Sequence, residues 1–186
     1  MLFDLLERLS SLTRVWFREH PKLTDLQPIQ LSALMYLGRC NRYSNTPLAV
    51  TEYLGLTKGT VSQSLKALEA KGLLIKTPDT RDKRSVHLAL TAPARALLDA
   101  VTPPDFLVAA AQRMGARAED LEVLLLELLR TIQRGENVPG FGLCRTCRFH
   151  QTVDGAAFCG LTQEPLESVE IELICREYGV PDITEV

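Results

Sequence analysis

The stretch from Thr46 to Leu90 constrains the fold of this chain more than any other part of the sequence. It predicts a short helix over 47–53 and a second helix that begins after Thr57 and ends at Gly72. Gly55 breaks the first helix, and the Thr57 hydroxyl is placed to accept from a free backbone N–H of the second. A glycine just past the last helical turn is the usual helix stop. The pattern therefore predicts two helices joined by a tight turn.

The second of these helices has two contrasting faces. Val61, Leu65 and Leu68 fall at i, i+4 and i+7, so they share one apolar face. The opposite face is small, polar and basic, with no acid before Glu69, and is formed by Gly59, Thr60, Ser62, Gln63, Lys66 and Ala70. An ordinary amphipathic surface helix is the alternative, but such a helix normally mixes both charges. The pattern favours a helix that enters the major groove of DNA.

A two-stranded hairpin follows the second helix. Residues 73–77 read as an apolar strand, and residues 86–90 alternate apolar and polar side chains, which is the period of a half-buried strand. The turn between them carries three cations, Arg81, Lys83 and Arg84. Together these elements predict a winged helix-turn-helix whose wing meets phosphates or an adjacent minor groove.

The run TKGTVSQSLKALEAKGLLIKTPDTRDKRSVHLALT resembles the MarR family of bacterial transcription regulators. The similarity lies in LEAKGLL at the end of the second helix, in the Asp79–Arg84 wing and in the Leu90-Thr91 step, and it covers roughly residues 1–135. It implies an obligate homodimer that reads a pseudo-palindromic site on double-stranded DNA and usually represses. It also implies a small effector, often aromatic or phenolic, bound between the dimer helices and the winged domain. Ala94 stands where the family often has glycine, and typical members lack the C-terminal segment.

The helix phase and the wing charges assign a role to each candidate DNA contact. Thr60, Ser62 and Gln63 are expected to meet base edges, and Gln63 can pair with adenine. Lys58 and Lys66 would flank them on phosphates, while Asp79 and Asp82 would brace the wing arginines. The complete predicted DNA-binding set is Lys58, Gly59, Thr60, Ser62, Gln63, Lys66, Arg81, Lys83 and Arg84.

The charge distribution agrees with this placement. The net charge of the whole chain is −2, which by itself does not indicate a nucleic-acid partner. Residues 1–95 hold 14 Lys and Arg against 8 Asp and Glu, a net of +6, whereas residues 96–186 hold 7 against 15, a net of −8. Local charge governs phosphate contact, so the basic half is the expected DNA-binding half.

Two helices at the ends of the predicted 1–135 domain are unusually apolar. Residues 2–19 and 118–134 each carry a leucine-rich stripe, which a monomer would leave as a large apolar patch in water. We therefore expect these helices to pack together in a homodimer. A helix over 28–39 would pack behind the predicted helix-turn-helix. Cys40 at its end is expected to be a buried small hydrophobe rather than a redox sensor.

The C-terminal segment has a different chemistry. It contains four thiols within 32 residues, Cys144, Cys147, Cys159 and Cys175, and Asp154-Gly155 predicts a hairpin that returns Cys159 to the first pair. Four thiolates suit a structural Zn²⁺, and a segment this short needs such a staple. The same residues could hold an iron–sulfur cluster, or could be redox thiols without a metal. His150 is expected to be a hairpin surface residue rather than a ligand.

These patterns predict a mainly α (α+β) chain with a winged helix-turn-helix, terminal dimerisation helices and a small four-cysteine metal module. The expected boundaries are a regulator domain over 1–135 with its DNA-binding core at 28–92, a linker at 136–142, and the module at 143–186. The predicted function is a DNA-binding transcriptional regulator in the cytoplasm that represses and responds to a small ligand, to metal or to redox state. The alternatives are a winged-helix protein-interaction module or a metal-cluster redox sensor without operator binding. An enzyme is not expected, because no catalytic triad or phosphate-loop pattern appears. No apolar run reaches the length of a membrane span.

Overall fold

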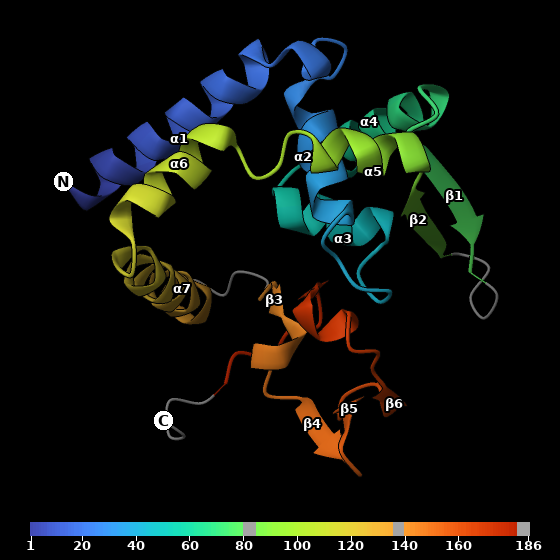
Figure 1. Ribbon diagram of the computed structural model, residues 1–186. Coiled ribbons are helices and arrows are strands. Elements are labelled where there is room, and N and C mark those ends of the chain that lie inside the picture. Colours follow the sequence, from blue (N-terminus) through green and yellow to red (C-terminus); the bar gives the residue numbers. More distant parts are fainter. Residues whose placement is uncertain (80–84, 136–139, 182–186) are drawn as a thin grey trace.

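The computed structural model describes residues 1–79, 85–135 and 140–181. It confirms the winged helix-turn-helix and places two further parts around it, a helical arm and a C-terminal module (Figure 1). The helices are α1 (Leu2–Glu19), α2 (Pro28–Leu37), α3 (Pro47–Leu54), α4 (Lys58–Ala70), α5 (Ala92–Asp99), α6 (Asp105–Met114) and α7 (Arg117–Gly135). Short 3-10 turns cover Pro21–Leu23, Cys144–Thr146 and Glu170–Glu172.

The helix-turn-helix is built from α3 and α4, and both begin at a threonine. Thr46 and Thr57 each accept a hydrogen bond at the N-terminus of the helix they precede, from Ala49 N–H and Thr60 N–H. These bonds satisfy backbone donors that have no partner within the helix. Gly55 ends α3 in the left-handed region at φ 63°, which glycine adopts without a steric cost. The tight turn predicted between the two helices is therefore confirmed.

The wing is an antiparallel pair of strands, β1 (Leu74–Pro78) and β2 (Val86–Leu90). The register pairs Leu74 with Leu90 at one end and Pro78 with Val86 at the other. The first strand begins one residue later than predicted, because Leu73 N–H still bonds back to the Leu68 carbonyl of α4. Gly72, at φ 68°, permits this closure of the helix.

The core lies between α2, α3, α4, α5 and the wing. Leu34, Tyr36 and Leu65 are almost completely buried there, and the apolar face predicted for α4 is buried as expected. The helix α2 ends at Leu37, two residues before the predicted end, and a turn through Gly38 leads into the α2–α3 loop. Cys40 in this loop is buried as predicted, and burial raises the pKa of its thiol to about 12.

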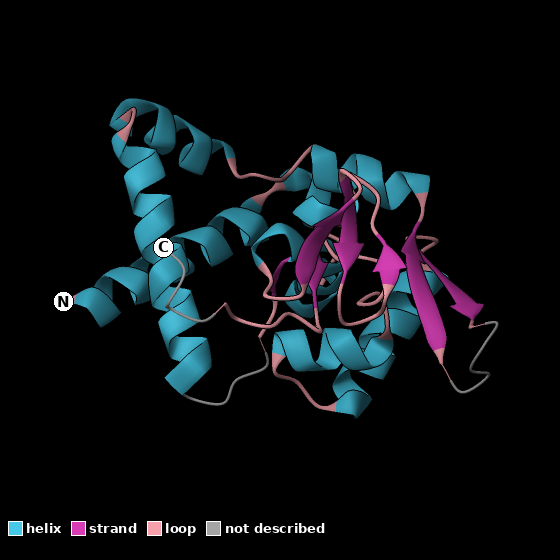
Figure 2. Ribbon diagram, turned by 90° about the horizontal axis from the view of Figure 1, so that it is seen from below, coloured by secondary structure: helices cyan, strands magenta, loops and turns pink. Residues whose placement is uncertain are grey.

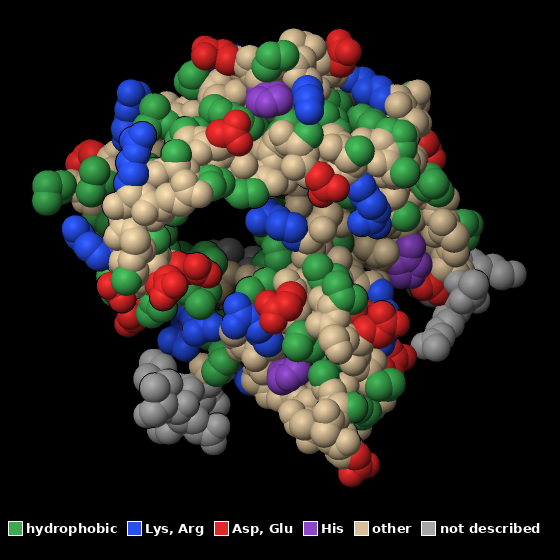
Figure 3. Space-filling view, in the orientation of Figure 1, with side chains coloured by type: hydrophobic (Ala, Val, Ile, Leu, Met, Phe, Trp, Pro, Cys, Tyr) green, Lys and Arg blue, Asp and Glu red, His purple; other side chains and the backbone are tan. Residues whose placement is uncertain are grey.

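The helical arm is formed by α1, α6 and α7 and stands away from the winged domain (Figure 1). Trp16 of α1 lies 6.3 Å from Phe106 of α6, measured between ring centroids, and holds these two helices together. None of the three helices has a buried residue. The space-filling view shows hydrophobic side chains at the outer end of the arm and an opening between the arm and the winged domain (Figure 3).

The C-terminal module is a set of short strands that lies beneath α3 (Figures 1 and 2). The strands β4 (His150–Val153) and β5 (Ala156–Cys159) form the predicted hairpin, and β6 (Glu164–Pro165) extends it. Asp154 and Gly155 occupy its turn at φ 51° and 80°, as a two-residue hairpin requires. A second pair joins β3 (Gly142–Leu143) to β7 (Ile174–Cys175).

The segment predicted as a linker over 136–142 is structured at its C-terminal end. Phe141 packs edge-to-face on Tyr36 and Tyr53, with ring centroids 5.9 Å and 5.1 Å away. Its ring thus joins the core of the winged domain, and Gly142 already belongs to β3. Residues 136–139 lie outside the described part of the chain. Among the residues that are described, no helix is long and apolar enough to cross a membrane.

Candidate nucleic-acid interface and cysteine site

The outer face of α4 presents the predicted contact residues to solvent. Lys58, Gly59, Ser62, Gln63 and Lys66 are all exposed. Thr60 is half-buried instead, and its hydroxyl lies 2.9 Å from the Thr57 hydroxyl at the start of the helix. Thr60 is therefore partly engaged in capping, so the exposed candidates for base contact on this helix are Ser62 and Gln63.

The electrostatics of this face are those expected for a helix that approaches phosphates. The first turn of α4 contains no acidic residue. The acid near its end, Glu69, is paired with Lys76 of β1 at 2.7 Å between Oε2 and Nζ. Since this ion pair neutralises the one carboxylate on the helix, Lys58 and Lys66 dominate the charge of the outer face.

The wing cations Arg81, Lys83 and Arg84 lie outside the described residues, so their predicted role stays a prediction. The base of the wing is described, and it contains a contact that the sequence did not indicate. His87 of β2 joins the residue after β1 to the α2–α3 loop. Its Nε2 lies 2.6 Å from Asp79 Oδ2, and its Nδ1 lies 2.6 Å from Asn45 Oδ1. Asp79 thus contacts a histidine of β2, a partner not foreseen when it was assigned to brace the wing arginines.

The four cysteines of the C-terminal module are brought together. Cys144, Cys147, Cys159 and Cys175 all line one cavity of about 20 Å³, which is enough for a single water or ion and little more. Burial, and then the neighbouring thiols of Cys175, Cys147 and Cys159, raise the pKa of the Cys144 thiol to about 11. The hairpin brings Cys159 to the first pair as predicted, because it pairs with His150 across β4 and β5.

Backbone donors point at two of these sulfurs. Gly179 N–H donates to Cys147 Sγ at 3.3 Å, and the backbone at Glu177 stabilises the charged form of Cys175. Such N–H groups favour thiolates, the form in which cysteine binds metal. His150 lines the same cavity, with Nδ1 4.0 Å from Cys144 Sγ, so it is half-buried at the site rather than a hairpin surface residue.

The fit to a metal is incomplete in one respect. In the described part of the chain, no group of three or more His, Cys, Asp or Glu side chains is arranged to hold a metal ion. The donor types, their number and their shared cavity suit a small thiophilic ion, but the thiols would have to close around it. The metal thus remains a prediction.

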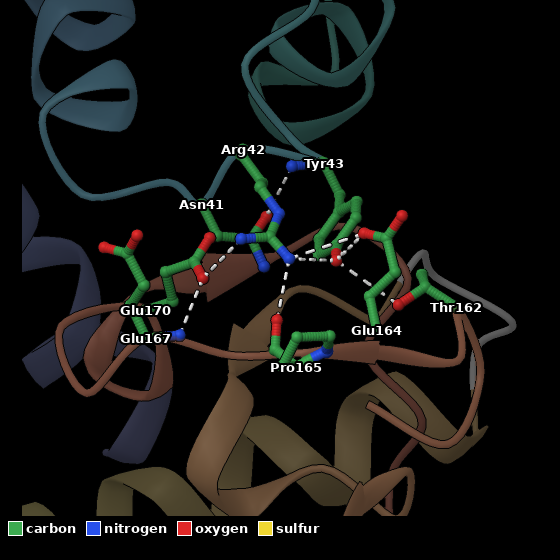
Figure 4. Close-up of polar contacts among 8 residues, drawn as sticks. All are labelled: Asn41, Arg42, Tyr43, Thr162, Glu164, Pro165, Glu167 and Glu170. Atoms are coloured by element: carbon green, nitrogen blue, oxygen red, sulfur yellow. Dashed lines mark hydrogen bonds and ion pairs between the residues drawn. The ribbon is translucent and has the colours of Figure 1, made fainter. Parts of the chain in front are cut away.

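The cysteine site lies against the winged domain, and this contact was not foreseen. Arg42, in the α2–α3 loop, donates to Glu170 Oε2 at 2.8 Å, to the Pro165 carbonyl at 2.9 Å and to Glu164 at 3.4 Å (Figure 4). Tyr43 OH adds a 2.6 Å bond to Glu164. We call these contacts the Arg42 clamp. Glu170 is buried, so its pairing with a guanidinium offsets the cost of removing a carboxylate from water.

Residues on both sides of Cys175 make a second set of contacts. The backbone N–H and C=O of Ile174 bond to the α2–α3 loop, at Arg39 O (2.7 Å) and Asn41 N (2.9 Å). Arg176 forms a bidentate pair with Glu52 of α3, at 2.5 and 3.0 Å, and donates its backbone N–H to Ser44 Oγ at 2.8 Å. The loop sequence Asn-Arg-Tyr-Ser-Asn is an ordinary polar connection between two helices, so the sequence carried no signal for this interface.

A separate cavity lies where the arm joins the winged domain. It has a volume of about 690 Å³ and is lined by residues of α1, α2, α5 and α6 and of the segments that follow α2 and α5. Phe17, Met35 and Leu98 supply apolar walls, while Arg39 and Arg95 supply positive charge. A cavity of this size, mostly apolar with a few polar groups, is typical of a small-molecule site.

The fold and the exposed face of α4 define the class: a winged helix-turn-helix protein of the kind that binds DNA. A model of the MarR family matches residues 24–85. The chain is 25% identical over 140 residues to the HTH-type transcriptional repressor NicR of Pseudomonas putida, across 73% of this chain and 89% of that protein. These matches show which proteins the chain is similar to over its winged helix-turn-helix part. The segment that the family model matches ends before the C-terminal module.

Solved structures share the fold. The chain superposes on S. aureus MepR in its DNA-binding conformation with a TM-score of 0.61 and 22% identity, over 72% of this chain and 99% of that one. It superposes on Streptococcus pneumoniae FabT in complex with DNA with a TM-score of 0.53 and 24% identity, over 73% and 93%. At these identities the likeness concerns the fold.

Proposed function

We propose that this protein is a transcriptional regulator that binds operator DNA through α4 and represses. The observation that carries this proposal is the outer face of α4: exposed, basic, free of acid over its first turn, and set in a winged helix-turn-helix. The family match and the relative named as a repressor support the same conclusion. An enzyme and a protein-interaction module are less favoured, because neither needs this face.

The salt dependence of binding to a selected operator tests this proposal. Each lysine that neutralises a phosphate releases a counterion, so Lys58→Ala and Lys66→Ala should each lower the slope of log affinity against log salt by about 1 per contact. Arg113→Ala, an exposed cation on α6, is the matched control and should leave the slope unchanged. No selectable operator, or identical slopes for all four proteins, would contradict the proposal.

The regulator acts as a homodimer in this proposal, with the arm as its interface. The arm carries a long exposed apolar surface, with Leu5, Leu9, Leu121, Leu125 and Ile132 among its members. A soluble monomer rarely exposes so much apolar area. Pairing of two arms would bury it and set two α4 helices on one DNA duplex.

The cavity between the arm and the winged domain is the proposed effector site. Two arginines, Arg39 and Arg95, outnumber the one acid of the lining, Asp99, and so favour an anionic ligand. The apolar walls favour an aromatic one, so the proposed effector is an aromatic carboxylate or phenolate. Salicylate is a suitable probe: it should weaken operator binding by the wild type, and Arg95→Gln should respond less. An equal response of both proteins would remove Arg95 from the site.

The C-terminal module binds one zinc ion in this proposal, through Cys144, Cys147, Cys159 and Cys175. The single-ion size of their shared cavity favours zinc over an iron–sulfur cluster, which is the alternative. Elemental analysis of anaerobically purified protein tests the choice. One zinc per chain in a colourless sample supports zinc, whereas iron with broad visible absorption supports the cluster and metal-free protein removes both.

A further inference from the structure

The side chain of Asn41 lies between the winged domain and the cysteine site. It is only 1% exposed and lines the cavity that the four cysteines share. Its Oδ1 accepts from Ser44 Oγ at 2.7 Å and from Tyr43 N–H at 3.2 Å, which shapes the α2–α3 loop. Its Nδ2 is buried with no hydrogen-bond partner of good geometry among the described residues. A buried donor without a partner destabilises the fold.

The Cys175 sulfur is the acceptor that this donor can reach. Asn41 and Cys175 line the same cavity, which is only about 20 Å³ in volume, so the two side chains lie close together. A neutral thiol is a weak acceptor, whereas a thiolate bound to a metal accepts N–H bonds strongly. The Asn41 donor would therefore gain its partner when the site takes up a metal ion.

The loop that carries Asn41 leads directly into the DNA-binding elements. Asn45 O accepts from Leu88 N–H of β2 at 2.7 Å, and Asn45 Oδ1 contacts His87 at the base of the wing. Thr46 then caps α3. Six consecutive residues, 41–46, thus connect the cysteine site to the wing and to the helix that packs on α4.

The module holds the same loop from its other side. The Arg42 clamp fastens it to Glu170 and Glu164, and the Arg176–Glu52 pair fastens the segment after Cys175 to α3. Small metal modules commonly lose their structure without their ion. Loss of the ion would therefore release the clamp and the Asn41 bond together.

We infer that metal binding at the four cysteines is coupled to DNA binding by the winged domain. Operator affinity depends on occupancy of the metal site, through the Arg42 clamp and through Asn41 as a positioning residue. This inference rests on the proposed operator and zinc binding. It differs from a merely structural zinc, because it requires the two affinities to change each other. By linkage, the factor by which Zn²⁺ tightens operator binding equals the factor by which operator tightens Zn²⁺ binding.

The test measures that factor in both directions on the full-length chain. Operator affinity is determined for zinc-loaded protein and for protein stripped with a chelator, and zinc affinity is determined by chelator competition with and without operator. We expect both ratios to be at least tenfold and equal to each other. Equal operator affinity in the loaded and stripped states would overturn the inference while leaving operator binding and zinc binding intact.

Two variants separate the contributions of Asn41 and the clamp. Asn41→Asp keeps the Oδ1 acceptor that shapes the loop, removes the donor and adds a negative charge beside the thiolates, so zinc affinity should fall at least tenfold. Asn41→Gln retains a donor and should recover part of it. The charge-transfer band of the Co²⁺-substituted protein should shift in Asn41→Asp but keep its intensity, since the four thiolates remain. An unchanged band and unchanged zinc affinity would exclude the Asn41–Cys175 bond.

Arg42→Gln is the second variant, on a side chain that is largely at the surface. It should lower zinc affinity less than Asn41→Asp does and reduce the coupling ratio toward one, because the module then binds its ion without holding the loop. Arg145→Gln, which removes the exposed Arg145–Glu172 pair inside the module, is the matched control and should keep full coupling. Full coupling in Arg42→Gln would show that the clamp carries none of it.

Discussion

At the scale of single residues, the short side chains on α4 explain how one exposed face can serve recognition. Ser62 and Gln63 are exposed, whereas Thr60 is held at the N-terminus of the helix by the Thr57 hydroxyl. The three residues were expected to act alike from the helix phase. Their environments differ because Thr60 lies in the first turn of α4, where its hydroxyl contacts the capping hydroxyl of Thr57.

Gln63 is expected to select a base. Replacing it with alanine should change the preferred operator at one position by about 1–3 kcal/mol, because a glutamine carboxamide can pair with both N6 and N7 on the major-groove edge of adenine. Site selection from random DNA is the measurement. Gln112→Ala, on an exposed glutamine of α6, should yield the wild-type consensus. The same consensus from Gln63→Ala would remove this residue from base recognition.

At the scale of secondary-structure elements, turns and caps agree with the sequence more closely than strand ends do. The positions of Gly55, Gly72 and Asp154-Gly155 required left-handed backbone, and the structure places each of them at positive φ. The strand β1 starts one residue later than predicted because the closing bond of α4, from Leu73 N–H to the Leu68 carbonyl, still holds Leu73 to the helix.

The cap at Thr57 is expected to stabilise α4 measurably. Thr57→Ala removes the acceptor for Thr60 N–H and should lower the free energy of unfolding by about 1 kcal/mol. Urea unfolding followed by circular dichroism measures this. Thr131→Ala, in the middle of the exposed α7, is the control, and it should be neutral or slightly stabilising because alanine is the better helix former. Equal effects of the two substitutions would show that the cap contributes nothing.

At the scale of the whole molecule, the arm is the part whose apolar surface a single chain leaves exposed. Its helices have amphipathic sequences, yet their apolar stripes face solvent, since one chain offers no surface to cover them. In the predicted dimer, the two arms would cover each other's apolar stripes.

Two substitutions on opposite faces of α7 test the interface. Leu125→Glu places a carboxylate in the apolar stripe and should weaken dimerisation about 100-fold or more, because an uncompensated buried charge costs at least about 3 kcal/mol. Val123→Glu introduces the same charge on the other face, where the side chain is 64% exposed, and should leave the dimer intact. Light scattering across a concentration series measures both. A monomeric wild type would contradict the interface and the paired reading of an operator.

Particular residues show which structural features the sequence predicts and which it does not. The apolar spacing of Val61, Leu65 and Leu68 predicts the buried face of α4, and the hairpin signal at Asp154-Gly155 predicts that Cys159 returns to Cys144 and Cys147. His150 was misplaced because a strand residue beside a turn is usually exposed, and only the folded hairpin shows that its ring faces the cavity.

What the sequence determined by itself is local: helix faces, caps and turns, which are set by contacts within a few residues of each other. What only the tertiary structure decided is the contact between the winged domain and the C-terminal module. Arg42 and Glu170 are separated by 128 residues, and Arg176 and Glu52 by 124. No periodicity connects such positions, because their pairing depends on how separately folded parts dock.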